Sequence, residues 1–120
     1  MSKHPVVHFE FSSNKPEADA KFYSELFGWE FQHMPEMNYA MFNPGGGPGG
    51  GLNQVTDGFP AGTLAIYIGT EDINASLANV EKLGGKTLVT RTEIPGMGHY
   101  AVFSDLTGNK VGLFEAPPDQ

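Results

Sequence analysis

Cysteine is absent from this chain of 120 residues. Without thiols the protein can form neither disulfides nor thiolate metal sites, and the composition suits a reducing compartment, so we expect a cytoplasmic location. Basic residues are also scarce, with seven lysines and arginines against fourteen acidic residues and a net charge of -7. A surface of that sign repels phosphate backbones, and no cluster of lysine or arginine offsets it. Nucleic acid is therefore not an expected partner.

Long apolar runs are missing as well. No segment approaches the roughly 20 apolar residues of a membrane span. Residues 1–5 lead directly into a strand pattern and contain no apolar stretch long enough for a signal peptide. We therefore expect no membrane partner. The length suits a single domain over residues 1–120, large enough to bury its own core.

What the sequence does contain is an internal repeat. With an offset of 57 positions, residues 7–13 align with residues 64–70, and Gly28 aligns with Gly85. With an offset of 61, residues 39–42 (Tyr-Ala-Met-Phe) align with residues 100–103 (Tyr-Ala-Val-Phe). The change of offset by four residues predicts one loop insertion in the second copy. A symmetric site can then be compared position by position.

Both copies predict the same order of elements. In the first copy we expect a strand at 6–11, a helix at 16–27 and strands at 29–33, 39–42 and 51–55; in the second, a strand at 63–69, a helix at 72–83 and strands at 86–90, 99–104 and 110–115. Each repeat unit, at about 5–56 and 62–116, is thus βαβββ. One unit cannot bury its sheet alone, so two must pair. The expected fold is α+β, a cupped eight-stranded mixed sheet with the helices on the outer face.

Strand alternation predicts which side chains line the cup. In the first strand Phe9 and Phe11 should pack on the helix, while His8 and Glu10 face the concave side. In the second copy the concave face should carry Tyr67. The last strands are expected to add Phe114 and, in the first copy, Asn53, and Phe42 is expected near the cavity.

The glycine-rich run Gly45–Gly51 lacks the Lys-Ser or Lys-Thr of a phosphate-binding loop, and no helix follows it. We expect a flexible hairpin there.

Several of these features together resemble a known superfamily. They are paired βαβββ units, a histidine in the first strand (His8), helices ending in glycine, the closing segment Asp105–Leu113, and Ile94–Gly98 followed by Tyr100–Phe103. The chain is similar to the vicinal oxygen chelate superfamily, which includes glyoxalase I, extradiol dioxygenases and bleomycin-binding proteins, and it most resembles the glyoxalase-like branch. The resemblance implies a small-molecule ligand and a homodimer.

Metal-using members of that superfamily carry four ligand positions related by the repeat. The resemblance places them on His8, Ala65, Gly51 and Gly112, of which only His8 has a donor side chain. Catalytic metals generally need about three protein ligands. We therefore expect no metal and no cofactor, with His8 the one remaining candidate ligand should a divalent metal such as Ni, Zn, Mn or Fe be used.

Two functions follow as hypotheses. The first is a small-molecule binding protein with a metal-free concave pocket lined by His8, Glu10, Asn53, Tyr67 and Phe114. The alternative is a glyoxalase-like lyase, isomerase or dioxygenase that uses a divalent metal at His8 or a metal-free His8/Glu10 acid–base pair. A non-catalytic dimer module is a third option. The sequence leaves open whether Glu10 is a pocket carboxylate or a solvated one, and whether the Tyr67 phenol binds a ligand or packs on the floor.

Overall fold

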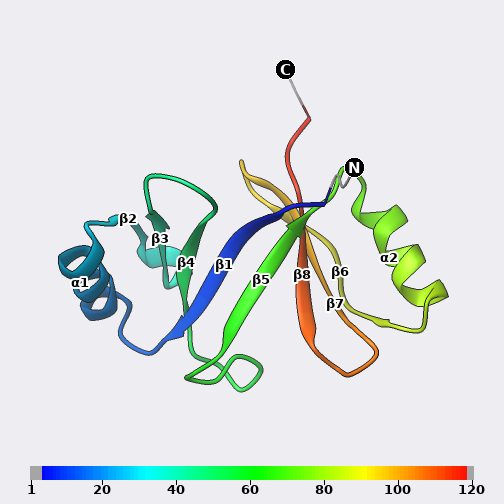
Figure 1. The fold of residues 1–120 in the computed structure, drawn as a ribbon, viewed down its shortest axis with the longest axis horizontal. Helices are drawn as coiled ribbons and strands as arrows, with labels where there is room; N and C mark the ends of the chain where they lie inside the picture. The colour runs from blue at the N-terminus through cyan, green and yellow to red at the C-terminus, as the bar shows by residue number, and fades with distance from the viewer. Residues whose placement is uncertain (1–3, 119–120) are drawn as a thin grey trace. The chain divides into compact units, whose positions relative to one another are not determined.

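The computed structural model describes residues 4–118. These residues form β1 (Val6–Ser13), α1 (Pro16–Phe27), β2 (Glu30–Met34), the 3-10 turn η1 (Pro35–Met37), β3 (Tyr39–Asn43), β4 (Gly49–Gln54), β5 (Leu64–Gly69), α2 (Ile73–Lys82), β6 (Lys86–Ile94), β7 (Gly98–Ser104) and β8 (Lys110–Glu115) (Figure 1). The α+β class and the two βαβββ repeats are confirmed. Neither helix in this range is long and apolar enough to cross a membrane.

The chain divides into two compact units, which we call the first unit (residues 8–65) and the second unit (residues 66–118 with residues 4–7). Strand order in the first unit is β2-β3-β4-β1, and in the second it is β6-β7-β8-β5. In both units the first and last strands pair in parallel, while the other pairs are antiparallel. The repeat seen in the sequence is therefore a repeat of topology as well.

The extra residues of the second copy are not in a loop, so that expectation was wrong. The turn between β6 and β7 spans only residues 95–97, while the ladder itself contains register shifts between Thr87 and Val89 and between Val89 and Thr92. A β-bulge places one additional residue on one strand without ending the pairing. The two shifts add two residues to β6, and β6 in all has nine residues where β2 has five.

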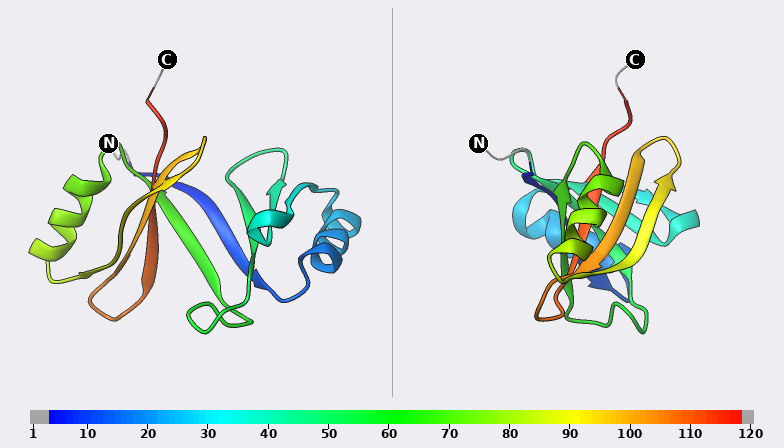
Figure 2. Two further views of the ribbon diagram at one scale, coloured as in Figure 1. Left: turned by 180° about the vertical axis from the view of Figure 1, so that it is seen from behind. Right: turned by 90° about the vertical axis from the view of Figure 1, so that its right-hand side faces the viewer.

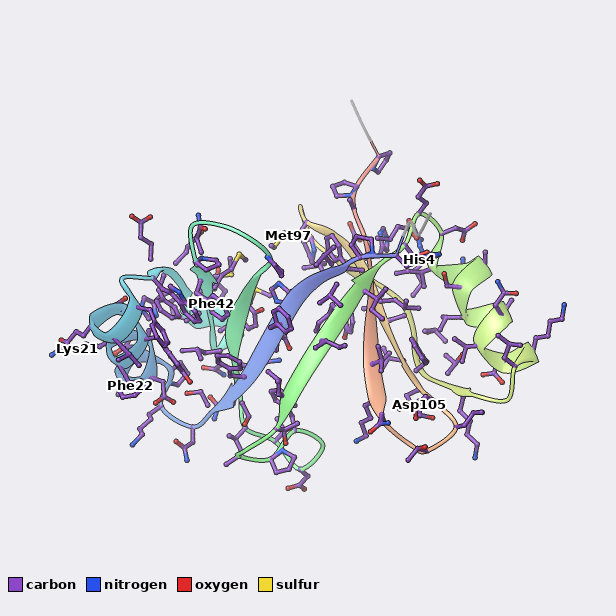
Figure 3. The ribbon with its side chains drawn as sticks, viewed as in Figure 1. His4, Lys21, Phe22, Phe42, Met97 and Asp105 are labelled. Carbon is purple, nitrogen blue, oxygen red and sulfur yellow. The ribbon has the colours of Figure 1, made fainter. Side chains whose placement is uncertain are left out.

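The core of the first unit lies between its sheet and α1. Ala20, Ala40 and Leu52 are buried there, with Phe11, Tyr23 and Phe31 packed against them. Phe42, which is labelled in Figure 3, also belongs to this core. It is buried, and its ring stacks on Trp29 with centroids 4.5 Å apart. The expectation that Phe42 lies near the ligand cavity is therefore wrong: it alternates with Tyr39 and Met41 along β3 and faces the helix side.

The second unit repeats this arrangement with α2 against its sheet (Figure 2). Ile73, Leu77, Ala101 and Leu113 are buried, and Ile68 and Phe103 pack on them. The expected helix-facing side of β5 and β8 is thus confirmed for Ile68 and Leu113. The Asp72 side chain caps α2 by accepting a hydrogen bond from the Ala75 N–H at 3.0 Å.

The glycine-rich run is divided between a turn and a strand. Residues 45–48 connect β3 to β4, and Gly45 and Gly47 have positive φ. Gly49–Gly51 already belong to β4, which pairs with both β1 and β3. The strand therefore starts two residues before its predicted beginning at Gly51, because missing side chains do not prevent pairing in a central strand.

Candidate functional site

The first unit brings three of the predicted site residues together. His8 and Glu10 lie two residues apart on β1 and share one face of that strand. Asn53 comes from β4, which runs parallel to β1 with Glu10 opposite Gly51. Asn53 donates from its Nδ2 to Glu10 Oε1 at 3.2 Å. The carboxylate of Glu10 is therefore buried among polar partners rather than solvated, and the residue is only 9% exposed.

A fourth residue, Tyr39, links the others. Its hydroxyl lies 2.7 Å from His8 Nε2 and donates to Glu10 Oε2 at 2.9 Å. His8 Nε2 and Glu10 Oε2 are themselves 3.5 Å apart. Because the Tyr39 hydroxyl donates its proton to Glu10, its oxygen accepts a hydrogen bond from an Nε2–H of His8. Hydrogen bonds thus run from imidazole to phenol to carboxylate.

This polar cluster (His8, Tyr39, Glu10 and Asn53) is graded in exposure. The side chain of His8 retains 26% of its accessible surface, whereas that of Glu10 retains 11%. Tyr39 and Asn53 are direct cross-strand neighbours on β3 and β4, so their side chains stand on the same face. Solvent or a ligand can therefore reach the imidazole, while the carboxylate is held at the inner end.

Gly51 is the position that makes room for the tyrosine. A Cβ built on Gly51 would overlap the ring and hydroxyl of Tyr39. At the neighbouring Gly50 a Cβ would instead meet the ring of Phe42 and the Phe9 carbonyl, on the helix side. Successive glycines of β4 are thus each covered by an aromatic ring, one on each face of the strand.

The second unit has the same contact at the equivalent place. Gly112 of β8 pairs with Tyr67 of β5, and a Cβ on Gly112 would overlap the Tyr67 ring. The Tyr67 ring therefore packs on the strand beside it, and this contact does not decide between the two roles expected for its phenol. Phe114 follows on β8, opposite Gly69. Contact of Tyr67 or Phe114 with a ligand stays a prediction.

The residues at the superfamily's metal positions do not fit a metal centre of that kind. Ala65 carries no donor atom, and the space above Gly51 and Gly112, where a ligand side chain would begin, is filled by Tyr39 and Tyr67. Only His8 retains a donor, and its Nε2 is hydrogen-bonded to Tyr39. Among residues 4–118 no three His, Cys, Asp or Glu side chains are grouped closely enough to hold a metal ion.

A separate ionic cluster in the second unit is structural. Glu115 accepts from Arg91 Nη2 at 2.8 Å and from the Ile73 N–H at 2.9 Å, which ties β8 to β6 and to the start of α2. The bond from Arg91, followed by that from Ile73, lowers the pKa of Glu115. His99 Nδ1 lies 3.3 Å from the Arg91 guanidinium, so this histidine belongs to the ionic cluster.

Tyr39 is the site residue that sequence reasoning missed. Its place in the repeat, beside Tyr100, drew attention to strand pairing rather than to chemistry. A usable signal was present, because alternation along β3 with Phe42 on the helix side puts Tyr39 on the side of Glu10. What the sequence could not provide was the parallel register that sets β1 beside β4.

Comparison with known proteins agrees with this architecture. The sequence model of the family described as "Glyoxalase-like domain" matches residues 8–114. A glyoxylase-like domain-containing protein of Didymella fabae is 29% identical over 120 residues, covering 93% of this chain and 94% of that protein. An anthracycline biosynthesis protein of Streptomyces peucetius is 29% identical over 122 residues, covering 83% of this chain and 42% of that protein.

A Mycobacterium tuberculosis protein named as a candidate glyoxylase is 30% identical over 106 residues, covering 82% of this chain and 41% of its own length. The chain thus spans about two-fifths of the mycobacterial and streptomycete relatives.

Solved structures match over nearly the full chain. A hypothetical protein of Bacillus halodurans superimposes with a TM-score of 0.77 at 13% identity, covering 99% of both chains. The methylmalonyl-CoA epimerase of Mycobacterium tuberculosis gives a TM-score of 0.73 at 13% identity, covering 95% of this chain and 89% of its own. At such identities the likeness concerns the fold.

Proposed function

We propose a function from the premise that this chain belongs to the glyoxalase-like domain family of the vicinal oxygen chelate superfamily. The chain binds a small organic molecule at the polar cluster, and it does so without the metal centre of that superfamily. One observation carries the proposal: Tyr39 covers Gly51 and joins His8 to Glu10. The phenol thereby stands where a metal ligand of the superfamily would begin. The site keeps polar anchors of the kind that orient a ligand, but these are hydrogen-bonding groups.

The names of the relatives suggest what the ligand resembles. The streptomycete relative is named for anthracycline biosynthesis, and anthracyclines are hydroxylated polycyclic aromatic compounds. A planar ligand with hydroxyl groups suits a site in which imidazole, phenol and carboxylate lie within 3.5 Å of one another. We therefore take the ligand class to be hydroxylated aromatic compounds.

Titration of protein stripped with EDTA tests this proposal. The probe is quinizarin, a dihydroxyanthraquinone whose fluorescence reports binding. We expect binding to wild type, and at least about tenfold weaker binding to Tyr39→Phe, which keeps the ring on Gly51 but removes the bridging hydroxyl. Tyr100→Phe is the matched control, since Tyr100 lies on β7 of the second unit. Equal affinity of wild type and Tyr39→Phe would contradict the proposed site.

A second candidate function is metal-independent proton transfer, because the cluster forms a chain of hydrogen bonds. The His8 imidazole takes a proton from a carbon next to a carbonyl. Its Nε2–H then gives a proton to the Tyr39 oxygen, and the Tyr39 hydroxyl gives its own proton to Glu10. The electrons of the broken C–H bond form the enolate. Return of a proton to carbon yields an isomer, and no other reactant is consumed.

The two candidates separate with Glu10→Gln. An isomerase loses solvent-deuterium exchange of the substrate C–H in this variant while it still binds the ligand. A binding protein shows no catalysed exchange even in wild type. The proposal also includes a homodimer, the assembly implied by the superfamily, which light scattering of the purified chain tests directly.

A further inference from the structure

The donors around the polar cluster converge on a carboxylate, and the unit that holds it is strongly acidic. We infer that the ligand is a neutral or cationic molecule that presents hydroxyl or ammonium donors, and that anionic ligands, CoA esters included, are rejected. This inference rests on the proposed function and specifies its substrate class. It departs from what the fold neighbours suggest, since several of them are epimerases of a CoA ester.

The hydrogen bonds at Glu10 run towards its carboxylate. Both oxygens of Glu10 accept, Oε2 from Tyr39 and Oε1 from Asn53. A ligand hydroxyl or ammonium can donate to this carboxylate or replace one of its present donors. An anionic group such as a sulfonate or a phosphate offers this carboxylate no donor of its own, and like charges brought together at a partly desolvated site cost affinity.

Acidic residues outnumber basic ones in the first unit. Residues 8–65 contain two basic residues, Lys15 and Lys21, against seven acidic ones. Lys21 is 77% exposed along its side chain and lies 3.8 Å from Glu25 on the same helix. Lys15 is exposed at the start of α1. α1 packs on the Phe11 side of the strands, and Glu10 lies on the other side, so neither lysine belongs to the face that a phosphate group would approach.

The experiment compares three probes that share one ring system. They are quinizarin, its sulfonated derivative and its aminomethyl derivative, titrated into wild type at low salt. We expect the sulfonated probe to bind at least about tenfold more weakly than the neutral probe, and the aminomethyl probe to bind at least as well as it. In Glu10→Gln the difference between sulfonated and neutral probes should fall to about twofold. Glu17→Gln is the control, because it removes the same charge from the exposed first turn of α1 and should leave the difference unchanged.

A salt series on wild type needs no variant and gives a second readout. Repulsion between the sulfonate and the cluster is screened as salt rises, so the affinity of the sulfonated probe alone should increase. Binding of the sulfonated probe as tight as that of quinizarin in wild type would overturn the inference and leave the proposed function standing. An equal effect of Glu10→Gln and Glu17→Gln would overturn the role of Glu10. Failure of all three probes to bind would overturn the proposed function and this inference with it.

Discussion

Removal of the Tyr39 hydroxyl is the sharpest test of the polar cluster. Tyr39→Phe retains the ring over Gly51, so packing is preserved while two hydrogen bonds are lost, at 2.7 Å to His8 and 2.9 Å to Glu10. A bond to a charged group contributes about 1.5–3 kcal/mol and a neutral one about 1 kcal/mol. His8, with 26% of its side-chain surface accessible, regains water readily, whereas Glu10, with 11%, regains it less well. We therefore expect a loss of about 2 kcal/mol in the free energy of unfolding, mostly from Glu10.

Urea unfolding followed by circular dichroism measures this loss, and thermal unfolding should show a decrease in Tm of about 6–10 °C for a chain of this size. Tyr100→Phe, which removes a hydroxyl from the second unit, should change the free energy of unfolding by less than about 0.5 kcal/mol. If Tyr39→Phe were as stable as Tyr100→Phe, the hydroxyl would not hold the cluster together, and the reasoning would be refuted.

Two further predictions concern stability. Gly51→Ala forces its Cβ into the Tyr39 ring and should lower the free energy of unfolding by about 1–3 kcal/mol in urea melts; Gly46→Ala, where a Cβ meets nothing within 4 Å, should change it by less than about 0.5 kcal/mol, and equal effects would contradict the packing of Tyr39 on β4. Glu115→Gln should lower the Tm at pH 7, because the pKa of Glu115 is depressed below its ordinary value near 4.5 by Arg91 and Ile73. A carboxylate whose folded-state pKa is depressed contributes its full stability above the ordinary pKa and loses it as pH falls through the lower, folded-state pKa. The Tm difference should therefore vanish at acid pH, and a difference independent of pH would contradict the assignment.

The architecture was predictable because short-range sequence patterns determine each helix and strand. Alternating apolar residues on β1 and β5, and helices closed by Gly28 and Gly84-Gly85, specify each element, and their recurrence at a fixed offset specifies two equal units. The insertion was misplaced because a β-bulge has no strong sequence signature, and the residues around the two register shifts, Leu88 to Arg91, suit a strand as well as a loop.

The site was predictable only in part. His8 and Glu10 follow from strand alternation, and Asn53 follows from the repeat. Tyr39 required knowledge of which strands are neighbours, because β3 reaches β1 only through β4. The sequence shows that Gly51 has no side chain to bind a metal. It does not show why glycine is needed there, because the Tyr39 ring that lies on Gly51 comes from a residue 12 positions away.

The central claim is that the cluster works through Tyr39 rather than through a metal. The most direct measurement is thermal unfolding of EDTA-stripped protein with Ni, Zn, Mn or Fe(II) added, for wild type and His8→Ala side by side. A metal present at about 100 times its Kd adds roughly 2.7 kcal/mol of stability, which is several degrees in Tm. We predict no such shift with any of the four metals. A rise of several degrees in wild type that disappears in His8→Ala would contradict the account.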